Sequence, residues 1–119
     1  MATKSWSNIT ITRGVIQSKV VLDAGDASDN LPIANYPDKT VHIYGGSFGD
    51  STVSLKGSND SSATFENLHR TNDPTLNYSA VAAALLGHIL ENPLYLQASV
   101  GGSTGTGITV TVISSTPRG

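Results

Sequence analysis

A chain of 119 residues has room for one domain, and its lack of cysteine excludes thiol catalysis, cysteine-ligated zinc and a disulfide scaffold. Charged residues make up only 13% of the chain, about half the ~25% of an average globular protein, and the seven Lys and Arg are scattered, so neither nucleic acid nor a membrane surface is an expected partner. No apolar run is long enough for a membrane span or a signal-peptide core, and we therefore expect a soluble protein that is not exported.

The N-terminal part of the chain reads as two extended segments followed by a loop. Trp6–Thr12 is typical of a short strand or an extended arm, and Val15–Leu22 is a β-branched strand that follows a break at Gly14. We assign residues 1–14 to an N-terminal extended arm and residues 15–119 to a single β-sandwich domain. From Asp23 to Pro37 the chain reads as a long loop, in which only residues 31–33 are apolar enough to reach a core.

The middle of the chain predicts a hairpin. Thr40–Tyr44 and Ser51–Lys56 both alternate between apolar and polar residues, and a Gly-rich connection separates them. The expected buried face of this hairpin carries Val41, Ile43, Val53 and Leu55. After another turn cluster, residues 63–68 predict a further strand, packed on the core through Phe65.

The C-terminal third contains the one segment in which a helix is expected. This segment is residues 76–90, because residues 80–86 are rich in good helix formers, and it allows at most two helical turns before Gly87. Leu94–Val100 and Ile108–Ile113 alternate on either side of a Gly-rich loop, and we expect these last two strands to pair. Seven or eight short strands with at most one short helix predict an all-β fold, an antiparallel β-sandwich of the jelly-roll-like kind.

The catalytic and metal motifs of the sequence have ordinary structural explanations. Residues 45–49 match the G-x-S-x-G pattern around Ser47, but an alternating strand follows where a nucleophile elbow needs a helix. His42, His69 and His88 show no ligand spacing. We expect no catalytic residue, and therefore a protein that is not an enzyme.

A calcium site is the one metal site that the sequence suggests. Asp23, Asp26 and Asp29 recur at intervals of three, yet the EF-hand pattern is absent and Asp in turns commonly binds its own backbone. Residues 101–107 have the glycine content of a phosphate-binding loop but lack its lysine and its helix. We expect no metal, no cofactor and no small-molecule ligand.

The composition suits binding to other proteins better than it suits catalysis or metal binding. Trp6 lies in a polar segment, where a large amphipathic ring is either a core plug or an anchor on another subunit. With so few charges, the surface can dock on protein without desolvating many of them. The hypothetical residues for contact with a capsid or a second copy are Trp6, Ile9, Ile11, Phe48 and Tyr95.

Three segments together resemble the small head decoration proteins, or capsid cement proteins, of tailed phages. They are Gly46-Ser47-Phe48-Gly49 with the following T-V-S-L-K-G-S-N-D strand and turn, residues 52–60; E-N-P-L-Y-L, residues 91–96; and the Gly/Thr loop of residues 100–106. The resemblance covers roughly residues 40 to 113.

This resemblance implies a structural virion protein with a jelly-roll-like sandwich, usually a homotrimer. Such a protein is made in the host cytoplasm and sits on the capsid exterior, where it clamps neighbouring major capsid subunits. Its partner is then the major capsid protein. The alternative from another class is a carbohydrate or host-surface binding module, because the G-S-N-D turn is also similar to that of discoidin-like sandwiches; a small hydrolase using Ser47 is the least favoured reading.

Overall fold

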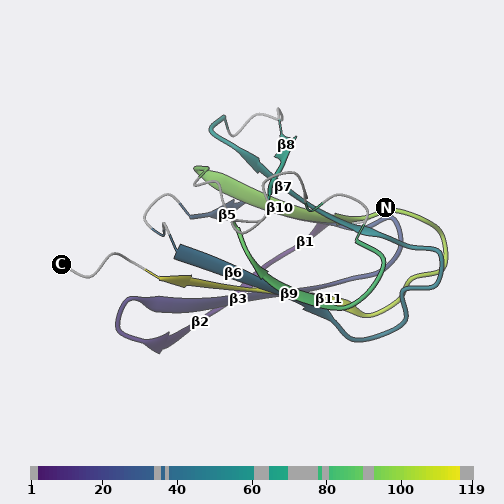
Figure 1. Cartoon of the computed structure of the whole chain (residues 1–119), viewed down its shortest axis with the longest axis horizontal. Helices are drawn as coiled ribbons and strands as arrows, with labels where there is room; N and C mark the ends of the chain where they lie inside the picture. Colours follow the sequence, from purple (N-terminus) through teal and green to yellow (C-terminus); the bar gives the residue numbers. More distant parts are fainter. Residues whose placement is uncertain are drawn as a thin grey trace.

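The chain forms two β-sheets that lie face to face (Figure 1). The computed structural model describes residues 3–33, 36, 38–60, 65–69, 78, 81–89 and 93–115, and these contain strands but no helix. Sheet A comprises β1 (Thr3–Lys4), β4 (Ala27–Ser28), β5 (Leu31–Pro32), β7 (Val53–Ser58), β8 (Glu66–Asn67) and β10 (Tyr95–Val100). Sheet B comprises β2 (Ser7–Thr12), β3 (Val15–Leu22), β6 (Asp38–Tyr44), β9 (Leu85–His88) and β11 (Ile108–Ser115). Across the described residues, no helical stretch long and apolar enough to span a membrane occurs.

The strand order confirms the predicted all-β, jelly-roll-like sandwich. In sheet B the order is β2-β3-β11-β6-β9, and in sheet A the main path is β1-β4-β10-β7-β8. The segment β6–β7 and the segment β10–β11 each pass from one sheet to the other. Because β6 pairs antiparallel with β11 and β7 pairs antiparallel with β10, the two segments form one antiparallel ribbon that is wound across both sheets. A ribbon wound in this way is the plan of a jelly roll.

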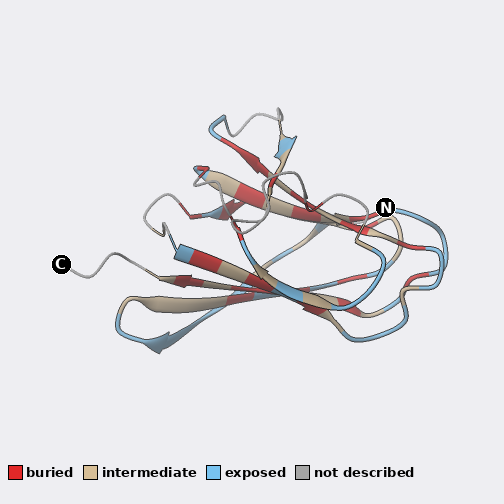
Figure 2. Ribbon diagram, viewed as in Figure 1, coloured by how far each residue is buried: buried red, intermediate tan, exposed pale blue. Residues whose placement is uncertain are grey.

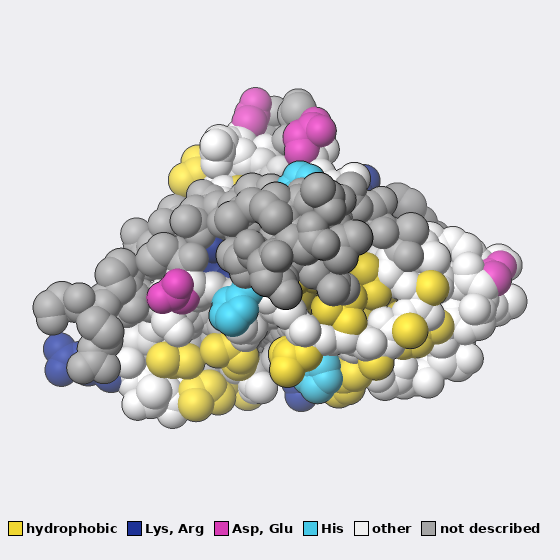
Figure 3. Space-filling view, viewed as in Figure 1, with side chains coloured by type: hydrophobic (Ala, Val, Ile, Leu, Met, Phe, Trp, Pro, Cys, Tyr) yellow, Lys and Arg dark blue, Asp and Glu magenta, His cyan; other side chains and the backbone are white. Residues whose placement is uncertain are grey.

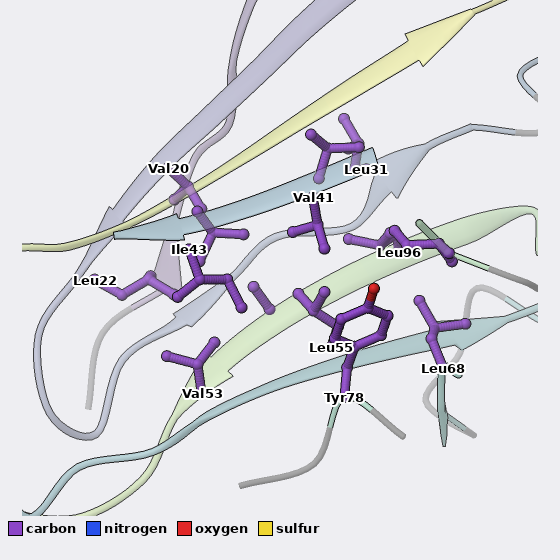
Figure 4. Close-up of a cluster of buried hydrophobic side chains, with 14 of the residues drawn as sticks. Val20, Leu22, Leu31, Val41, Ile43, Val53, Leu55, Leu68, Tyr78 and Leu96 are labelled. Atoms are coloured by element: carbon purple, nitrogen blue, oxygen red, sulfur yellow. The ribbon is translucent and has the colours of Figure 1, made fainter. Parts of the chain in front are cut away.

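The core lies between the two sheets and is built by alternation along the strands. On β6 and β7 the predicted face is buried completely, with Val41, Ile43, Val53 and Leu55 each at 0% exposure. Leu31 and Ile33 reach the core as expected, but the segment predicted as a long loop contains two short strands, β4 and β5. Tyr78 lies among Leu55, Leu68 and Leu96 in Figure 4, and its hydroxyl donates a hydrogen bond to the carbonyl of His88. Figure 2 shows buried residues on the strands of both sheets.

Both predicted hairpins are wrong, because the strands concerned lie in opposite sheets. β6 belongs to sheet B and β7 to sheet A, and the same holds for β11 and β10. A Gly-rich connection of seven or more residues is long enough to span the roughly 10 Å between packed sheets, and its glycines allow the positive φ angles of a sharp reversal. Strand alternation identifies the buried face but does not say which strand lies beside which.

The helix expected around residues 80–86 is also wrong for the part that the structure describes. Leu85–His88 is the edge strand β9, paired with β6, and Val81 makes an isolated bridge to Val53. Helix propensity is a weak preference that tertiary pairing overrides. Residues 76, 77, 79, 80 and 90 of the predicted helical segment lie outside the described residues.

Two further segments differ from the sequence prediction. Between residues 63 and 68 it is Leu68, at 3% exposure, that enters the core, while Phe65 stays only partly buried; residues 63 and 64 are outside the described part of the chain. Residues 3–12, predicted as an arm, lie within the sandwich. β1 pairs with β4 in sheet A, and β2 pairs with β3 in sheet B.

Three chain crossings lie side by side at one end of the sandwich, which is the right-hand end of Figure 1. We call residues 23–26, 45–52 and 101–107 the arch end. The central crossing binds both neighbours through its backbone: Ser47 and Thr106 exchange two hydrogen bonds of 2.9 Å, and the Ala24 N–H donates to the Gly105 carbonyl at 2.9 Å. The crossings therefore fix the two sheets relative to each other.

Glycine is required where these crossings meet. A Cβ on Gly46, which has φ +52°, would lie 1.9 Å from the Thr106 carbonyl oxygen, and a Cβ on Gly49 would lie 2.2 Å from the Thr104 hydroxyl. Gly25 also has a positive φ, +83°, but nothing lies within 4 Å of its Cβ position. An alanine at Gly25 would meet only the strain of the positive φ angle, whereas an alanine at Gly46 would also clash with the neighbouring crossing. Comparing the two substitutions separates these two effects on stability.

We predict that Gly46→Ala destabilises the fold by about 2–5 kcal/mol, because a left-handed backbone and a backbone clash act together. Gly25→Ala, the matched control, should cost only about 1–2 kcal/mol for its conformation. Urea denaturation of both variants measures the difference. Equal losses would contradict the close approach of the crossings.

Candidate interaction surface

The side of sheet B that faces away from the core is an extended surface formed by five strands. Alternation assigns it directly, since the neighbours of buried residues on each strand point outward. Strand register then places these residues in rows across the sheet. We call this surface the outer face of sheet B; it consists of Ser7, Ile9, Val15, Gln17, Lys19, Val21, Asp38, Thr40, His42, Tyr44, Leu86, His88, Thr109, Thr111, Ile113 and Ser115.

Large apolar side chains stand exposed on this face. Leu86 is 71% exposed, Ile9 55% and Val21 50%, and Ile11, which is 55% exposed, lies in the β-bulge next to Ile9. The one further large apolar side chain of comparable exposure in the described residues is Leu94, which precedes β10 of sheet A. In Figure 3, hydrophobic side chains gather along the lower side of the molecule, over sheet B. Ile9, Val21 and Leu86 lie on three strands of one face, which makes this face a candidate site of protein contact.

The face carries little charge. Lys19 and Asp38 are its two charged residues, and the others are polar or apolar. Burying such a face against another protein therefore desolvates few ions, which is the costly part of forming an interface.

The centre of the face is ordered by an aromatic pair. The rings of His42 and Tyr44 lie 4.3 Å apart between centroids, and the hydroxyls of Tyr44 and Thr111 are 3.4 Å apart, within hydrogen-bonding distance. Thr111, in the middle row, is only 5% exposed although it points outward. Leu86 lies directly across from His42. The centre is thus a fixed platform, which lowers the entropy that docking would cost.

A second ordered surface lies at the arch end, around the carboxylate of Asp50. Its two oxygens accept hydrogen bonds of 2.8–2.9 Å from the backbone N–H and the hydroxyl of both Ser103 and Thr104. These hydrogen bonds, of which the one from the Ser103 N–H contributes most, lower the pKa of Asp50 well below its ordinary value. These four hydrogen bonds join the crossing of residues 45–52 to the crossing of residues 101–107, and we call them the Asp50 latch.

The structure does not gather the five residues predicted to contact a partner. Ile9 and Ile11 lie at the β2 border of sheet B, whereas Tyr95 is on β10 of sheet A and Phe48 is in the arch end. Trp6 and Phe48 are partly buried and pack against the core. The Trp6 indole N–H donates to the Asp29 carbonyl at 2.9 Å. Trp6 therefore has the contacts of a core plug.

Two exposed apolar residues of the outer face of sheet B were not predicted from the sequence. Leu86 was hidden by the expected helix, and Val21 by its place within the apolar run Val20-Val21-Leu22. Part of the signal for Val21 was available: in a strand with one buried face, Val20 and Leu22 point to one side and Val21 to the other, so an apolar residue must be exposed on one of the two sides.

The three aspartates considered for calcium each bind backbone. Asp23 accepts from the Gly107 N–H at 2.8 Å, Asp26 from the Asp23 N–H at 3.0 Å, and Asp29 from the Trp6 N–H at 3.3 Å. Within the described ranges, no three His, Asp or Glu side chains come together as metal ligands do.

The two sequence motifs with rival functions are also structural. Ser47 lies on a crossing between strands of opposite sheets, with Val53–Ser58 following as a strand, so it does not occupy the strand-to-helix turn of a nucleophile elbow. In the G-S-N-D turn, the Ser58 hydroxyl donates to the Asp60 carbonyl at 2.6 Å, and the Asn59 side-chain oxygen accepts from the Leu94 N–H at 3.1 Å. This turn fastens the end of β7 to the start of β10.

Comparison with known proteins bears on the fold alone. No family model matches it, and no curated protein matches its sequence. The crystal structure of the SPBc2 prophage-derived protein YomS is similar, with a TM-score of 0.53 and 19% identity, covering 90% of this chain and 98% of YomS. A cupin of the RmlC-like family from Methanocaldococcus jannaschii, with a double-stranded β-helix fold, has a TM-score of 0.48 and 13% identity, covering 95% of this chain and 80% of the cupin.

We predict that Asp50→Asn lowers the melting temperature at neutral pH, because the amide replaces a charged acceptor of four hydrogen bonds. A depressed pKa in the folded state means that the stabilisation is complete above the unfolded pKa of about 3.9 and is lost as the pH falls below it. The difference in melting temperature between wild type and variant should therefore shrink steadily below about pH 4.

Thermal melts from pH 7 down to strongly acidic buffer measure this change. Glu66→Gln is the control, because Glu66 is an exposed carboxylate on the edge strand β8. A pH-independent difference for Asp50→Asn would show that the latch does not depend on charge.

Proposed function

We propose that this protein is a decoration protein of a phage head, which binds the capsid exterior and stabilises the lattice of major capsid protein. The observation that carries the proposal is the outer face of sheet B, which is ordered, poor in charge and studded with exposed apolar side chains. A protein that acts by adhesion needs such a face and no reactive group. Its docking surface is centred on Val21, Tyr44 and Leu86.

The energetics of decoration suit a protein of this kind. A protein that binds the assembled lattice but not its free subunits stabilises the lattice by the free energy of binding. Many copies bind each head, so a modest affinity at each site is enough. The arch end suits the same role, because crossings that lock the two sheets keep the docking face in one shape.

Two likenesses support a phage setting. The chain resembles head decoration proteins in its hairpin-like Gly-x-Phe-Gly, G-S-N-D and E-N-P-x-Y-L segments, and its fold is similar to that of a protein described as prophage-derived. The fold alone is shared by proteins of many functions, so the docking face carries more of the argument.

The test is binding to expanded, empty heads assembled from the major capsid protein of the phage that encodes the chain. We expect wild-type protein to saturate a fixed number of sites per head. Val21→Asp combined with Leu86→Asp should weaken binding at least about tenfold, because the two carboxylates would have to be desolvated in the interface. The matched control is Leu94→Asp, which places the same charge at an exposed leucine outside the face and should bind as wild type does.

Other results would overturn the proposal. Wild-type protein that ignores heads but is retained on a glycan array would be a carbohydrate or host-surface binding module. Hydrolase activity that is lost in Ser47→Ala would make the protein an enzyme. Equal binding by the double variant and the control would move the contact away from sheet B.

A further inference from the structure

The edge strand β2 is open along its whole length. It pairs with β3 on one side, it ends the strand order of sheet B, and all six of its residues are exposed. Among the described residues, Ser7–Thr12 make no backbone hydrogen bond other than those to β3. In Figure 1 β2 lies at the lower border of the molecule, and Figure 2 shows it exposed. Its outward N–H and C=O groups are therefore available to another strand.

Apart from one β-bulge, this edge lacks the features that usually prevent pairing between molecules. Edge strands are commonly kept very short or are marked by charge or proline. The edge strands β1 and β8 of sheet A have two residues each, and β9 at the far border of sheet B has four. β2 has six, with the sequence S-N-I-T-I-T, which contains neither charge nor proline. The bulge between Thr10 and Thr12 is its one irregularity.

We propose that β2 pairs antiparallel with β2 of a second copy of this chain, about a two-fold axis near Ile9. In this arrangement Ile9 lies opposite its own counterpart, Asn8 opposite Thr10, and Ser7 opposite Ile11. No like charges face each other, because the strand has none. The pairing brings together Ile9 and Ile11 of both copies, which are 55% exposed in the single chain, and cross-strand pairs of β-branched residues stabilise a sheet.

Charge at the two ends of β2 favours the second copy as the occupant. Asp29, which is exposed, is held at the N-terminal end of the strand, where its Oδ1 accepts from the Trp6 N–H at 3.3 Å. Arg13, also exposed, follows the strand at its C-terminal end. Antiparallel pairing sets the C-terminal end of one β2 beside the N-terminal end of the other, so Arg13 of each copy faces Asp29 of its neighbour. A two-fold axis makes this favourable contact twice.

The pairing has a geometric consequence for docking. An antiparallel edge-to-edge contact with the two-fold axis perpendicular to the sheet leaves both outer faces of sheet B on the same side. The dimer then presents two docking faces in one continuous sheet, and the second binding event becomes intramolecular. The inference rests on β2 and the charged residues at its two ends, and it stands independently of the proposed function. It favours a dimer over the trimer that the family resemblance implies.

Cysteine scanning tests the pairing directly, because the chain has no cysteine of its own. Single variants Ser7→Cys, Ile9→Cys and Ile11→Cys are oxidised, and the disulfide-linked dimer is quantified by non-reducing electrophoresis. Directly opposed residues of antiparallel strands have Cα atoms about 4.5–5.5 Å apart, within the range of a disulfide. We expect the linked dimer to peak at Ile9→Cys and to fall toward both ends of the strand. Leu94→Cys, an exposed site away from the edge, is the control for random collision.

Light scattering after size exclusion gives the second measurement. Wild type should have about twice the 12.3 kDa mass of the chain, with the dimer dissociating on dilution. Ile11→Lys should give the single-chain mass, because in both copies it replaces an apolar side chain of the contact with an ammonium group that would have to be desolvated there. The matched control Val21→Lys, with the same charge on the same sheet but away from the edge, should stay dimeric. Arg13→Asp should raise the dissociation constant about three- to tenfold.

Three results would overturn the inference. They are a wild-type protein that has the single-chain mass at every concentration, a trimer that survives Ile11→Lys, and cross-linking at Ile9→Cys no greater than at Leu94→Cys. Circular dichroism of the variants shows whether each is folded, and since the side chains of β2 are exposed, all should be. None of these measurements involves a phage head, so they fail or succeed separately from the test of decoration.

Discussion

The meeting of three chain crossings at the arch end is the constraint on which the rest of the structure depends. Strands in different sheets share no ladder of hydrogen bonds, so apolar packing alone would let the two sheets slide over each other. The crossings prevent this because they are bonded to one another, through the Ser47–Thr106 pair, through Ala24 and Gly105, and through the Asp50 latch on Ser103 and Thr104. Backbones approach so closely there that Gly46 tolerates no side chain. A sandwich locked at one end can hold its outer faces flat without disulfide or metal.

Sequence reasoning identified the parts that depend on local pattern and missed those that depend on which segments meet. Alternation predicted the strands around Val41, Leu55 and Val110 and the side of each that is buried. The Gly-rich connections were misread as hairpins, because positive-φ glycines serve a reversal within one sheet and a crossing between two equally well. The helix around residues 80–86 failed because its helix formers say nothing of the pairing between β6 and β9. Of the exposed apolar residues on sheet B, Ile9 and Ile11 were named from the sequence as candidates for partner contact, while Val21 and Leu86 needed the fold to show which way they point.

Many polar side chains of this protein form hydrogen bonds that hold the fold together, and this is relevant to its function. The carboxylates of Asp23, Asp26 and Asp50 hold backbone N–H groups of loops, and the side chains of the G-S-N-D turn do the same. The apolar groups show the opposite tendency, since several large ones are left in solvent on sheet B instead of in the core. A protein whose carboxylates rigidify its loops, and whose exposed hydrophobic side chains lie on one face, is suited to adhesion.

The central position of β11 in sheet B has a consequence for how the protein folds. The C-terminal strand lies at the centre of the sheet, between β3 and β6, and forms the longest ladders with both. Strands synthesised first must therefore wait for the last one, because until Ile108–Ser115 has left the ribosome the sheet has a gap in its middle. Sheet B therefore cannot close before residue 115 has been made, and pairings between segments distant in sequence form slowly. A nascent chain stalled before residue 108 would expose the inner residues of β3 and β6 together, which makes premature termination a route to aggregation.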